Sequence, residues 1–212
     1  MKFALTALGA AMGAMSFGTI INASFEDPTY SLGSFGQNGM PGWSSTSSYG
    51  AWNIPNNPFF LAEAPHGTQI GYTNGPAIAQ QTDDVLNVGL TTLSVMGGRR
   101  SDSLSRSFYL QLWAGGTQKD GSLTGGTLLG EVLFDVSSIA SASFKLVTLD
   151  YQASANDANL GKQLTVRMAL QPGSGGGQIN FDDVRLNAVP EPGTWLALGV
   201  GACALIRRRR RA

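Results

Sequence analysis

The sequence predicts an all-β protein, an antiparallel jelly-roll β-sandwich. Two runs show this most clearly, because apolar side chains alternate with polar or amphipathic ones in Phe108–Ala114 and again in Gln163–Leu170. A two-residue period is typical of a strand with one buried face. No part of the body has the period of an amphipathic helix. Without helices to cross over a parallel sheet, we expect the strands to pair antiparallel.

Each further strand is predicted from a short run rich in β-branched or aromatic residues, bounded by Gly, Ser, Asn or Pro. In chain order these runs are Ile20–Phe25, Gln69–Thr73, Ala77–Gln81, Thr91–Gly97, Leu128–Phe134, Phe144–Tyr151 and Ile179–Leu186. Together they give about nine strands, enough for two sheets. Asp135–Ala142 allows one helical turn at most. A hydrophobic content of 42% suffices for a core and excludes a wholly disordered chain.

Charge is unevenly distributed along the 212 residues, of which only 13% are charged. The formal net charge is zero, but five arginines stand together at 207–211, after an apolar stretch. Residues 17–189 hold eight basic and thirteen acidic side chains, for a net charge of −5. The body is therefore acidic and lacks the basic patch of a nucleic-acid-binding protein. We expect no nucleic-acid partner.

The first 18 residues predict a secretory signal peptide. Lys2 precedes the apolar, small-residue stretch Phe3–Phe17, and the small residues at 14–18 suit cleavage. A buried N-terminal helix or strand is the alternative, but the run has no polar face. We expect residues 1–18 to be removed on export, ahead of a sandwich domain at 19–187.

The C-terminal segment 188–212 has three parts in order: Pro190-Glu191-Pro192, the apolar stretch Trp195–Ile206, and the arginine tail. The apolar stretch is shorter than the roughly 20 residues of a full membrane span, although the segment approaches that length if the arginines snorkel. The positive-inside rule keeps the arginines cytoplasmic. We therefore expect a single transmembrane sorting helix that anchors the precursor in the inner membrane.

This end resembles the PEP-CTERM sorting signal, in which the same three parts occur in the same order. The resemblance implies recognition by an exosortase in the inner membrane of a Gram-negative bacterium. It also implies cleavage near Pro190, Glu191 and Pro192, with a product at the cell surface or outside the cell. Proteins of this kind commonly accompany exopolysaccharide production.

The body resembles galactose-binding-like and carbohydrate-binding-module jelly rolls. Asn22–Pro28 and Gln178–Leu186 match the N-x-S-F-E and F-D-[DN]-V patterns of their first and last strands. The body is also similar to that of other exported PEP-CTERM proteins and, more distantly, to calcium-dependent cyclases of indole alkaloid biosynthesis. The resemblance implies a carbohydrate-binding-like sandwich in which calcium often binds where the first and last strands meet.

Three carboxylates are candidate metal ligands. The apolar phase of the last strand slips at Asp182-Asp183, which predicts a β-bulge. Two carboxylates at a bulge, near Glu26 of the first strand, would repel one another unless a cation lay between them. Calcium binds six to eight oxygen ligands, so we predict structural calcium held by Glu26, Asp182 and Asp183. The alternative is that both aspartates are solvated and that Glu26 pairs with Arg185.

Catalytic chemistry finds little support in the sequence. Cys203 lies in the sorting segment, so the body has no cysteine, and His66 is the single histidine. Zinc sites and Cys/His nucleophilic catalysis are thereby excluded, and a Gly-x-Ser-x-Gly motif is absent. Acids such as Asp102, Asp150 and Asp182 leave an enzyme as an alternative.

Aromatic residues are the remaining candidates for ligand contact. Trp43, Trp52 and Tyr72 lie in an irregular, Gly- and Ser-rich stretch, while Tyr109 and Trp113 share one face of a strand. Such rings can stack on sugars, with amide groups binding the hydroxyls; the alternative is that Trp43 and others are buried under loops.

Taken together, these patterns predict a noncatalytic exported protein of the cell envelope or extracellular matrix that binds exopolysaccharide. One alternative is a calcium-dependent cyclase-like or carbohydrate-active enzyme. The other is a purely structural matrix protein.

Overall fold

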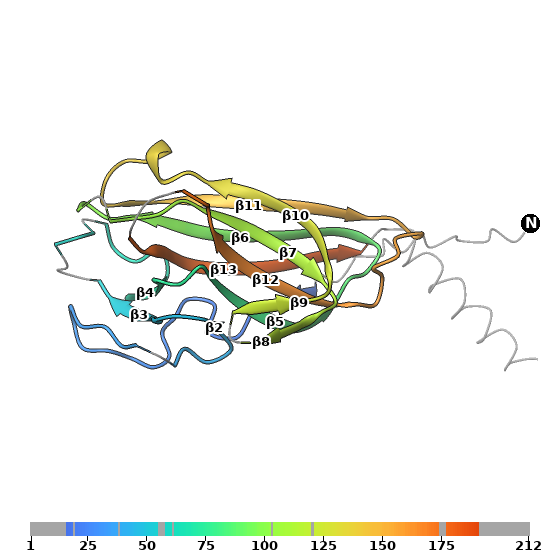
Figure 1. Ribbon diagram of the computed structural model, residues 1–212, viewed down its shortest axis with the longest axis horizontal. Helices are drawn as coiled ribbons and strands as arrows, with labels where there is room; N and C mark the ends of the chain where they lie inside the picture. Colours follow the sequence, from blue (N-terminus) through green and yellow to red (C-terminus); the bar gives the residue numbers. More distant parts are fainter. Residues whose placement is uncertain are drawn as a thin grey trace, which may run out of the picture.

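The computed structural model describes residues 16–190 apart from 19, 38, 55–57, 61, 103, 120 and 174–176. Two antiparallel sheets pack face to face (Figure 1). The first sheet has the order β11 (Ser143–Ala153), β6 (Gly89–Arg99), β13 (Ile179–Pro190), β4 (Gln69–Thr73) and β3 (Tyr49–Asn53), with β1 (Ser16–Gly18) also paired to β13. The second has the order β10 (Thr127–Phe134), β7 (Phe108–Ala114), β12 (Gln163–Leu170), β5 (Ala77–Val85) and β2 (Ser44–Ser45).

The prediction of an antiparallel β-sandwich is confirmed. From β4 to β7, and again from β10 to β13, each successive main strand lies in the opposite sheet, a connection pattern of jelly rolls. The alternation stops between β7 and β10, which both lie in the second sheet and are connected through the hairpin of β8 (Thr117–Lys119) and β9 (Ser122–Thr124). The single helical turn allowed after Asp135 is the 3-10 helix η1 (Val136–Ser138), with the Asp135 side chain accepting a hydrogen bond from the Ser137 amide.

The prediction of a strand at Ile20–Phe25 is wrong. Asn22 and Phe25 have φ angles of 52° and 60°, outside the extended region, and the Phe25 amide donates to the Asn22 carbonyl. The Asn22 side chain also bonds both backbone groups of Asp27. Asn is a residue that tolerates this left-handed conformation, so the segment folds as a turn.

Strands β1, β2, β3, β8 and β9 are absent from the predicted set. The β8–β9 hairpin is too short to give a hydrophobic pattern. β3 has the sequence YGAWN, in which Gly and Ala weaken the strand signal. Its pairing with β4, from Tyr49 opposite Thr73 to Asn53 opposite Gln69, nevertheless completes the edge of the first sheet.

The main core lies between the two sheets, where the alternating side chains of β7 and β12 are fully buried. Phe25 fills one end of this core with no exposed surface, and its ring centroid lies 5.0 Å from Phe181 and 5.4 Å from Trp43. The Trp43 indole N–H donates to the carbonyl of Ile21. The turn at residues 21–25 therefore anchors the N-terminal segment to the core.

The predicted β-bulge in β13 is present. The register between β13 and β6 shifts between Asp182 and Arg185, and Asp183 has a φ of 49°. As a result both Phe181 and Val184 point into the core, although three residues apart on a regular strand they would point to opposite faces. The bulge leaves Asp182 on the outer face of the first sheet.

A second hydrophobic cluster covers part of that outer face, around strands β3 and β4. Its buried members are Trp52, Ile54, Phe60, Ile70 and Tyr72, with Phe59, Ala64 and Phe144 packed against them. The residues between β3 and β4 supply Phe59 and Phe60, so this connection is held onto the sheet by aromatic contacts rather than lying free in solvent.

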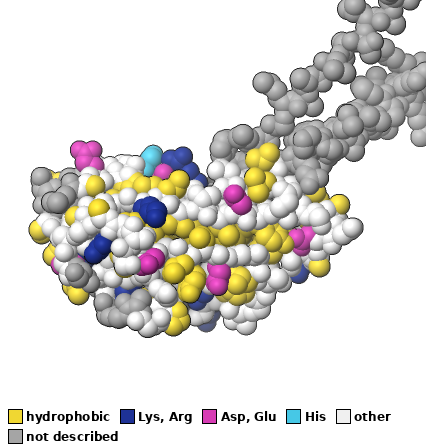
Figure 2. Space-filling view, turned by 90° about the horizontal axis from the view of Figure 1, so that it is seen from above, with side chains coloured by type: hydrophobic (Ala, Val, Ile, Leu, Met, Phe, Trp, Pro, Cys, Tyr) yellow, Lys and Arg dark blue, Asp and Glu magenta, His cyan; other side chains and the backbone are white. Residues whose placement is uncertain are grey.

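Both sheets and both hydrophobic clusters lie within residues 16–190. One continuous core of fully buried side chains joins the two sheets within that span, so we expect residues 16–190 to fold as a unit. No helix within the described residues is long and apolar enough to cross a membrane. The predicted signal-peptide core and sorting helix fall outside those residues. Lys and Arg side chains are scattered over the face seen in Figure 2 and form no basic patch there.

We predict that Phe181→Ala lowers the free energy of unfolding by about 3–5 kcal/mol, since it removes a fully buried ring that contacts two other aromatics. Leu146→Ala, on β11 and 56% exposed, serves as the control and should cost less than about 0.5 kcal/mol. Urea unfolding of residues 16–190 measures both changes. Equal effects for the two variants would contradict the placement of Phe181 in the core.

Candidate functional site

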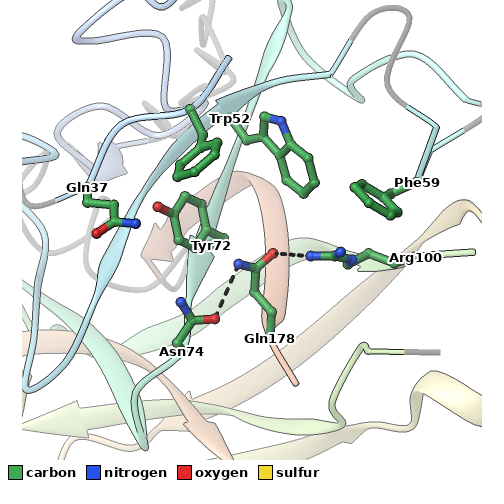
Figure 3. A pocket seen from close by; sticks show the side chains of 8 residues that line it. Gln37, Trp52, Phe59, Tyr72, Asn74, Arg100 and Gln178 are labelled. Carbon is green, nitrogen blue, oxygen red and sulfur yellow. Dashed lines mark hydrogen bonds between the residues drawn. The ribbon is translucent and has the colours of Figure 1, made fainter. Parts of the chain in front are cut away.

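A pocket of about 290 Å³ lies beside the second hydrophobic cluster, at the end of the sandwich where β6 ends. Figure 3 shows its labelled side chains converging from β3 and β4, from the loops that carry Gln37 and Phe59, from the residue after β6 and from the residue before β13. The lining residues are Phe35, Gln37, Trp52, Phe59, Tyr72, Asn74, Arg100 and Gln178. Half of them are aromatic, so the walls are largely apolar with a few polar groups among them.

The aromatic wall is built on the pairing of β3 with β4. Trp52 opposes Ile70 there, and Tyr72 is two residues further along β4 on the same face. The Phe35 ring lies edge-on to both Trp52 and Tyr72, with centroids 6.3 Å apart in each case. The Tyr72 hydroxyl donates to the Gly36 carbonyl at 2.9 Å, and burial raises the pKa of this hydroxyl. Tyr72 is therefore a neutral, fixed part of the wall.

Arg100 supplies the charge in the pocket. Its guanidinium carbon lies 4.3 Å from the ring centroid of Phe59 and 5.2 Å from that of Trp52, distances that give a cation–π interaction. Asp102 accepts from Arg100 Nε at 3.0 Å and from Nη2 at 2.5 Å. Burial opposes ionisation of Asp102, but the bonds from Arg100 and from the Leu104 amide outweigh it and lower the Asp102 pKa. The pair is ionised and rigid.

Amide side chains extend this network across the pocket. Gln178 accepts from Arg100 Nη1 at 3.2 Å and donates to Asn74 Oδ1 at 3.3 Å, as the dashed lines in Figure 3 show. Asn180 donates to the same Gln178 oxygen at 2.7 Å. Two buried polar atoms beside this network, Trp52 Nε1 and Asn180 Oδ1, have no hydrogen-bond partner among the described residues. Such atoms are costly in a protein interior.

The structure brings together only two of the five aromatic residues predicted to contact a ligand. Trp52 and Tyr72 line the pocket. Trp43 is 4% exposed and lies in the main core, so it has no free face for a ligand. Tyr109 and Trp113 lie on β7, on the outer face of the second sheet.

Several pocket residues were not predicted from the sequence. Phe35 and Gln178 come from loops or strand ends, where no periodic pattern marks them. The adjacent pair Arg99 and Arg100 offers a partial signal, because arginine next to a strand end in an acidic body needs a partner. The sequence alone could not show that this partner is Asp102 or that two aromatic rings flank the guanidinium group.

The three predicted calcium ligands do not converge. Asp183 is turned toward Arg185, with Arg185 Nε at 2.8 Å from its Oδ1 and Nη2 at 2.8 Å from its Oδ2. The predicted alternative pairing of Arg185 with Glu26 is also not formed. Among the described residues, no group of three or more His, Cys, Asp and Glu side chains is arranged to hold a metal.

Glu26 and Asp182 nevertheless accept hydrogen bonds from residues just before and at the start of β4. Glu26 Oε1 accepts from the amides of Thr68 and Gln69 at 2.8 and 2.7 Å. Asp182, which has no exposed surface, accepts from the His66 amide at 2.8 Å and from the Asp183 amide at 2.7 Å. Burial raises the pKa of Asp182 to about 8, with the charges of Asp183 and Glu26 adding to the rise against the two amide bonds.

Comparison with known proteins identifies the fold. A family model described as HpiC1 cyclase matches residues 18–187. The chain belongs to the HpiC1-like family. A second model, the PEP-CTERM protein-sorting motif, matches residues 188–211, so the resemblance drawn from Pro190, Glu191 and Pro192 is confirmed. The motif indicates exosortase-dependent export from a membrane-anchored precursor. No curated protein matches the sequence.

Two solved cyclase structures share the fold of this chain. The Stig cyclase Fisc from Fischerella sp. TAU, in complex with (3Z)-3-(1-methyl-2-pyrrolidinylidene)-3H-indole, has a TM-score of 0.68 and 24% identity, with 84% of this chain and 99% of that chain covered. An apo cyclase from Fischerella sp. has a TM-score of 0.68 and 23% identity, with coverage of 83% and 97%. The CBM22-1 xylan-binding domain of Paenibacillus barcinonensis Xyn10C has a TM-score of only 0.47 and 12% identity, with coverage of 86% and 99%.

These findings correct the expectation of a noncatalytic protein. Membership of the HpiC1-like family, and a fold shared with Stig cyclases, indicate an enzyme-like domain.

The three acids considered for catalysis lie in different parts of the structure. Asp102 is paired with Arg100 beside the pocket, Asp150 is exposed on β11 and accepts from Thr92 Oγ1, and Asp182 is buried beneath the His66 loop.

We predict that the sandwich loses stability as the pH rises from about 4 to about 8 in metal-free buffer. Asp182 ionises near pH 3.8 in the unfolded chain but near pH 8 in the folded one, so the folded state holds one more proton between these values. Its contribution is complete below about pH 4 and is lost as the pH rises, by at most about 1.4 kcal/mol per pH unit.

Urea unfolding of residues 16–190 at several pH values between 4 and 8 measures this slope. Asp182→Asn should flatten it, because the titrating group is gone. Asp150→Asn changes an exposed aspartate on β11 and should leave the slope as it is. A slope that persists unchanged in Asp182→Asn would show that other groups cause it.

Proposed function

We propose that this chain is an exported, exosortase-processed enzyme of the cyclase type, whose pocket binds a small, flat, ring-bearing substrate. The observation that carries the proposal is the aromatic pocket around Arg100, on a domain that belongs to a cyclase family. Its volume of about 290 Å³ lies at the lower end of the ~300–1,000 Å³ usual for small-molecule sites. A ligand of one or two fused rings is the size class that fits.

The walls suit a planar ring system better than a flexible polar chain. Rings of Phe35, Trp52, Phe59 and Tyr72 are held at tilted or edge-on angles to one another, and aromatic faces and edges prefer such arrangements with a further ring. Two Fischerella cyclase structures contain indole compounds, the pyrrolidinylidene-indole and 4-(1H-indol-3-yl)butan-2-one. These ligands support an aromatic, nitrogen-containing substrate class here.

Arg100 and Gln178 would orient the substrate through a polar atom. Arg100 keeps part of its hydrogen-bonding capacity, because Asp102 and Gln178 account for three of its five N–H groups. Holding a flexible substrate with its reacting atoms close together lowers the entropic part of a ring-closure barrier. Fixed N–H donors also stabilise negative charge that develops in a transition state. These are the contributions that the described pocket residues can make.

We predict that residues 16–190 bind 4-(1H-indol-3-yl)butan-2-one in this pocket and that Trp52→Ala weakens the affinity at least tenfold by removing one wall. Isothermal titration calorimetry measures both values. Tyr109→Ala removes an aromatic side chain from the other sheet and should leave the affinity unchanged. Binding that is absent, or that survives Trp52→Ala, would remove the support for this function.

We also propose that calcium stabilises the domain where Glu26 meets Asp182. The carboxylate of Asp182 is fully buried and is close enough to Glu26 and Asp183 for their charges to raise its pKa. Carboxylate oxygens from Glu26 and Asp182, completed by backbone carbonyls, are the donors that calcium prefers. Asp183 would have to give up its pair with Arg185 to join them. The ion's role would be structural.

We predict that millimolar calcium raises the melting temperature of residues 16–190 at pH 7.5 and that EDTA reverses the rise. Binding of a cation to the folded state alone stabilises it by mass action. It should also abolish the loss of stability between pH 4 and 8, because bound calcium keeps Asp182 ionised. Asp182→Asn should respond to neither reagent. If wild type and Asp182→Asn respond equally, calcium binds elsewhere.

A further inference from the structure

The outer face of the second sheet carries a group of side chains that the pocket does not use. β10, β7 and β12 lie side by side in this sheet. Their pairing places Glu131 opposite Gln111 and Gln111 opposite Arg167. Because directly paired residues share a face, these three side chains form one polar row across the three strands.

An aromatic residue lies on each side of this polar row. Trp113 and Tyr109 are each two residues from Gln111 along β7, and therefore on the same face. Trp113 pairs with Leu128 of β10 and Tyr109 with Leu133. Both rings are partly exposed, in contrast to Trp43 in the core. The face thus alternates an apolar row, a polar row and a second apolar row.

Hydrogen bonds fix the polar row in place. Arg167 Nη1 donates to Gln111 Oε1 at 2.7 Å, and Trp113 Nε1 donates to the same oxygen at 3.2 Å. Gln111 Nε2 in turn donates to Glu131 Oε2 at 2.8 Å. Gln111 is 8% exposed. The orientation of the Arg167 guanidinium and the Trp113 ring is therefore set before any ligand arrives.

Arg167 is a partly buried cation in this row. It forms no ion pair among the described residues, and its Nε is buried without a hydrogen-bond partner. Burial alone lowers its pKa, although an arginine stays charged at any physiological pH. Thr165, opposite Trp113 and with no exposed surface, also has a hydroxyl without a partner in the part of the chain that the structure describes. Buried charges and polar groups normally have partners.

We propose that this face is a second binding site, and that its ligand is a polysaccharide chain bearing carboxylate groups. A carboxylate matches the planar fork of the Arg167 guanidinium and would supply the missing negative charge. Tyr109 and Trp113 are four residues apart, about 14 Å along an antiparallel strand. That spacing suits a linear chain whose rings stack on both aromatic residues, with the acidic sugar between them at Arg167.

The charges and aromatic residues of this face favour an acidic polysaccharide over other ligands. One unpaired arginine, with Glu131 in the same row and an acidic body around it, does not fit the many phosphates of a nucleic acid. A small free anion would need Arg167 but neither aromatic residue. A neutral polysaccharide would need the aromatic residues but not the arginine. The three possibilities are therefore distinguished by variants at Arg167 and Trp113.

The test is calorimetric titration of residues 16–190 with a mannuronic acid octasaccharide and with the same octasaccharide after reduction of its carboxyl groups. This span omits the arginine tail, which would itself attract anions. We expect binding of the acidic form only, weaker at higher salt, and at least tenfold weaker in Arg167→Gln and in Trp113→Ala. Arg167→Lys keeps the charge without the fork and should retain part of the affinity.

Two controls separate this site from the rest of the molecule. Lys145→Gln removes an exposed positive charge from β11 of the first sheet and should leave the affinity unchanged. Trp52→Ala removes one wall of the pocket and should also leave the affinity for the octasaccharide unchanged. Failure of the pocket function can therefore be told apart from failure of this second site. Near-ultraviolet circular dichroism confirms that each variant is folded. No binding of the acidic octasaccharide, equal binding of the reduced one, or an Arg167→Gln variant that binds like wild type would overturn the proposal.

Discussion

The β-bulge at Asp182 and Asp183 determines how the outer face of the first sheet and its pocket are assembled. It allows β13 to bury Phe181 and Val184 in the same core and still present Asp182 to the opposite face. There Asp182 holds the His66 amide, while the adjacent Glu26 holds the amides of Thr68 and Gln69. Asp182 at this irregularity thus fastens the connection between β3 and β4 to the sheet, and the Val184 amide fastens the N-terminal turn by donating to the Ala23 carbonyl at 3.0 Å.

The pocket follows from that fastening. Residues of the β3–β4 connection carry Phe59 and Phe60 onto the outer face, and β4 begins at Gln69, directly after the segment that Glu26 holds. Arg100 then lies between Phe59 and Trp52, with Asp102 fixing its orientation. The second sheet is independent of this arrangement, since its outer face is ordered by direct strand pairing and by the Gln111 network. The two faces can therefore bind different ligands.

Sequence periodicity was sufficient for most of the fold and insufficient for the site. The alternation in β7 and β12, and the phase slip at Asp182, predict the sandwich and its bulge because burial imposes a two-residue period on every strand. Periodicity gave a wrong prediction at Ile20–Phe25, where Asn22 adopts a left-handed conformation and the apolar run forms a turn. The pocket depends on contacts between loops far apart in sequence, such as Phe59 with Arg100, which no local pattern records. Trp52 and Tyr72 could be predicted as candidates, but not their separation from Trp43, Tyr109 and Trp113.

NMR of the indole N–H groups shows whether the aromatic pocket of the first sheet binds the indole ligand. Residues 16–190 contain three tryptophans, Trp43, Trp52 and Trp113, located in the core, the pocket and the second sheet. During titration of ¹⁵N-labelled protein with 4-(1H-indol-3-yl)butan-2-one, the Trp52 resonance should shift while those of Trp43 and Trp113 stay in place. A shift at Trp113 with Trp52 unchanged, or no shift at all, would contradict the account.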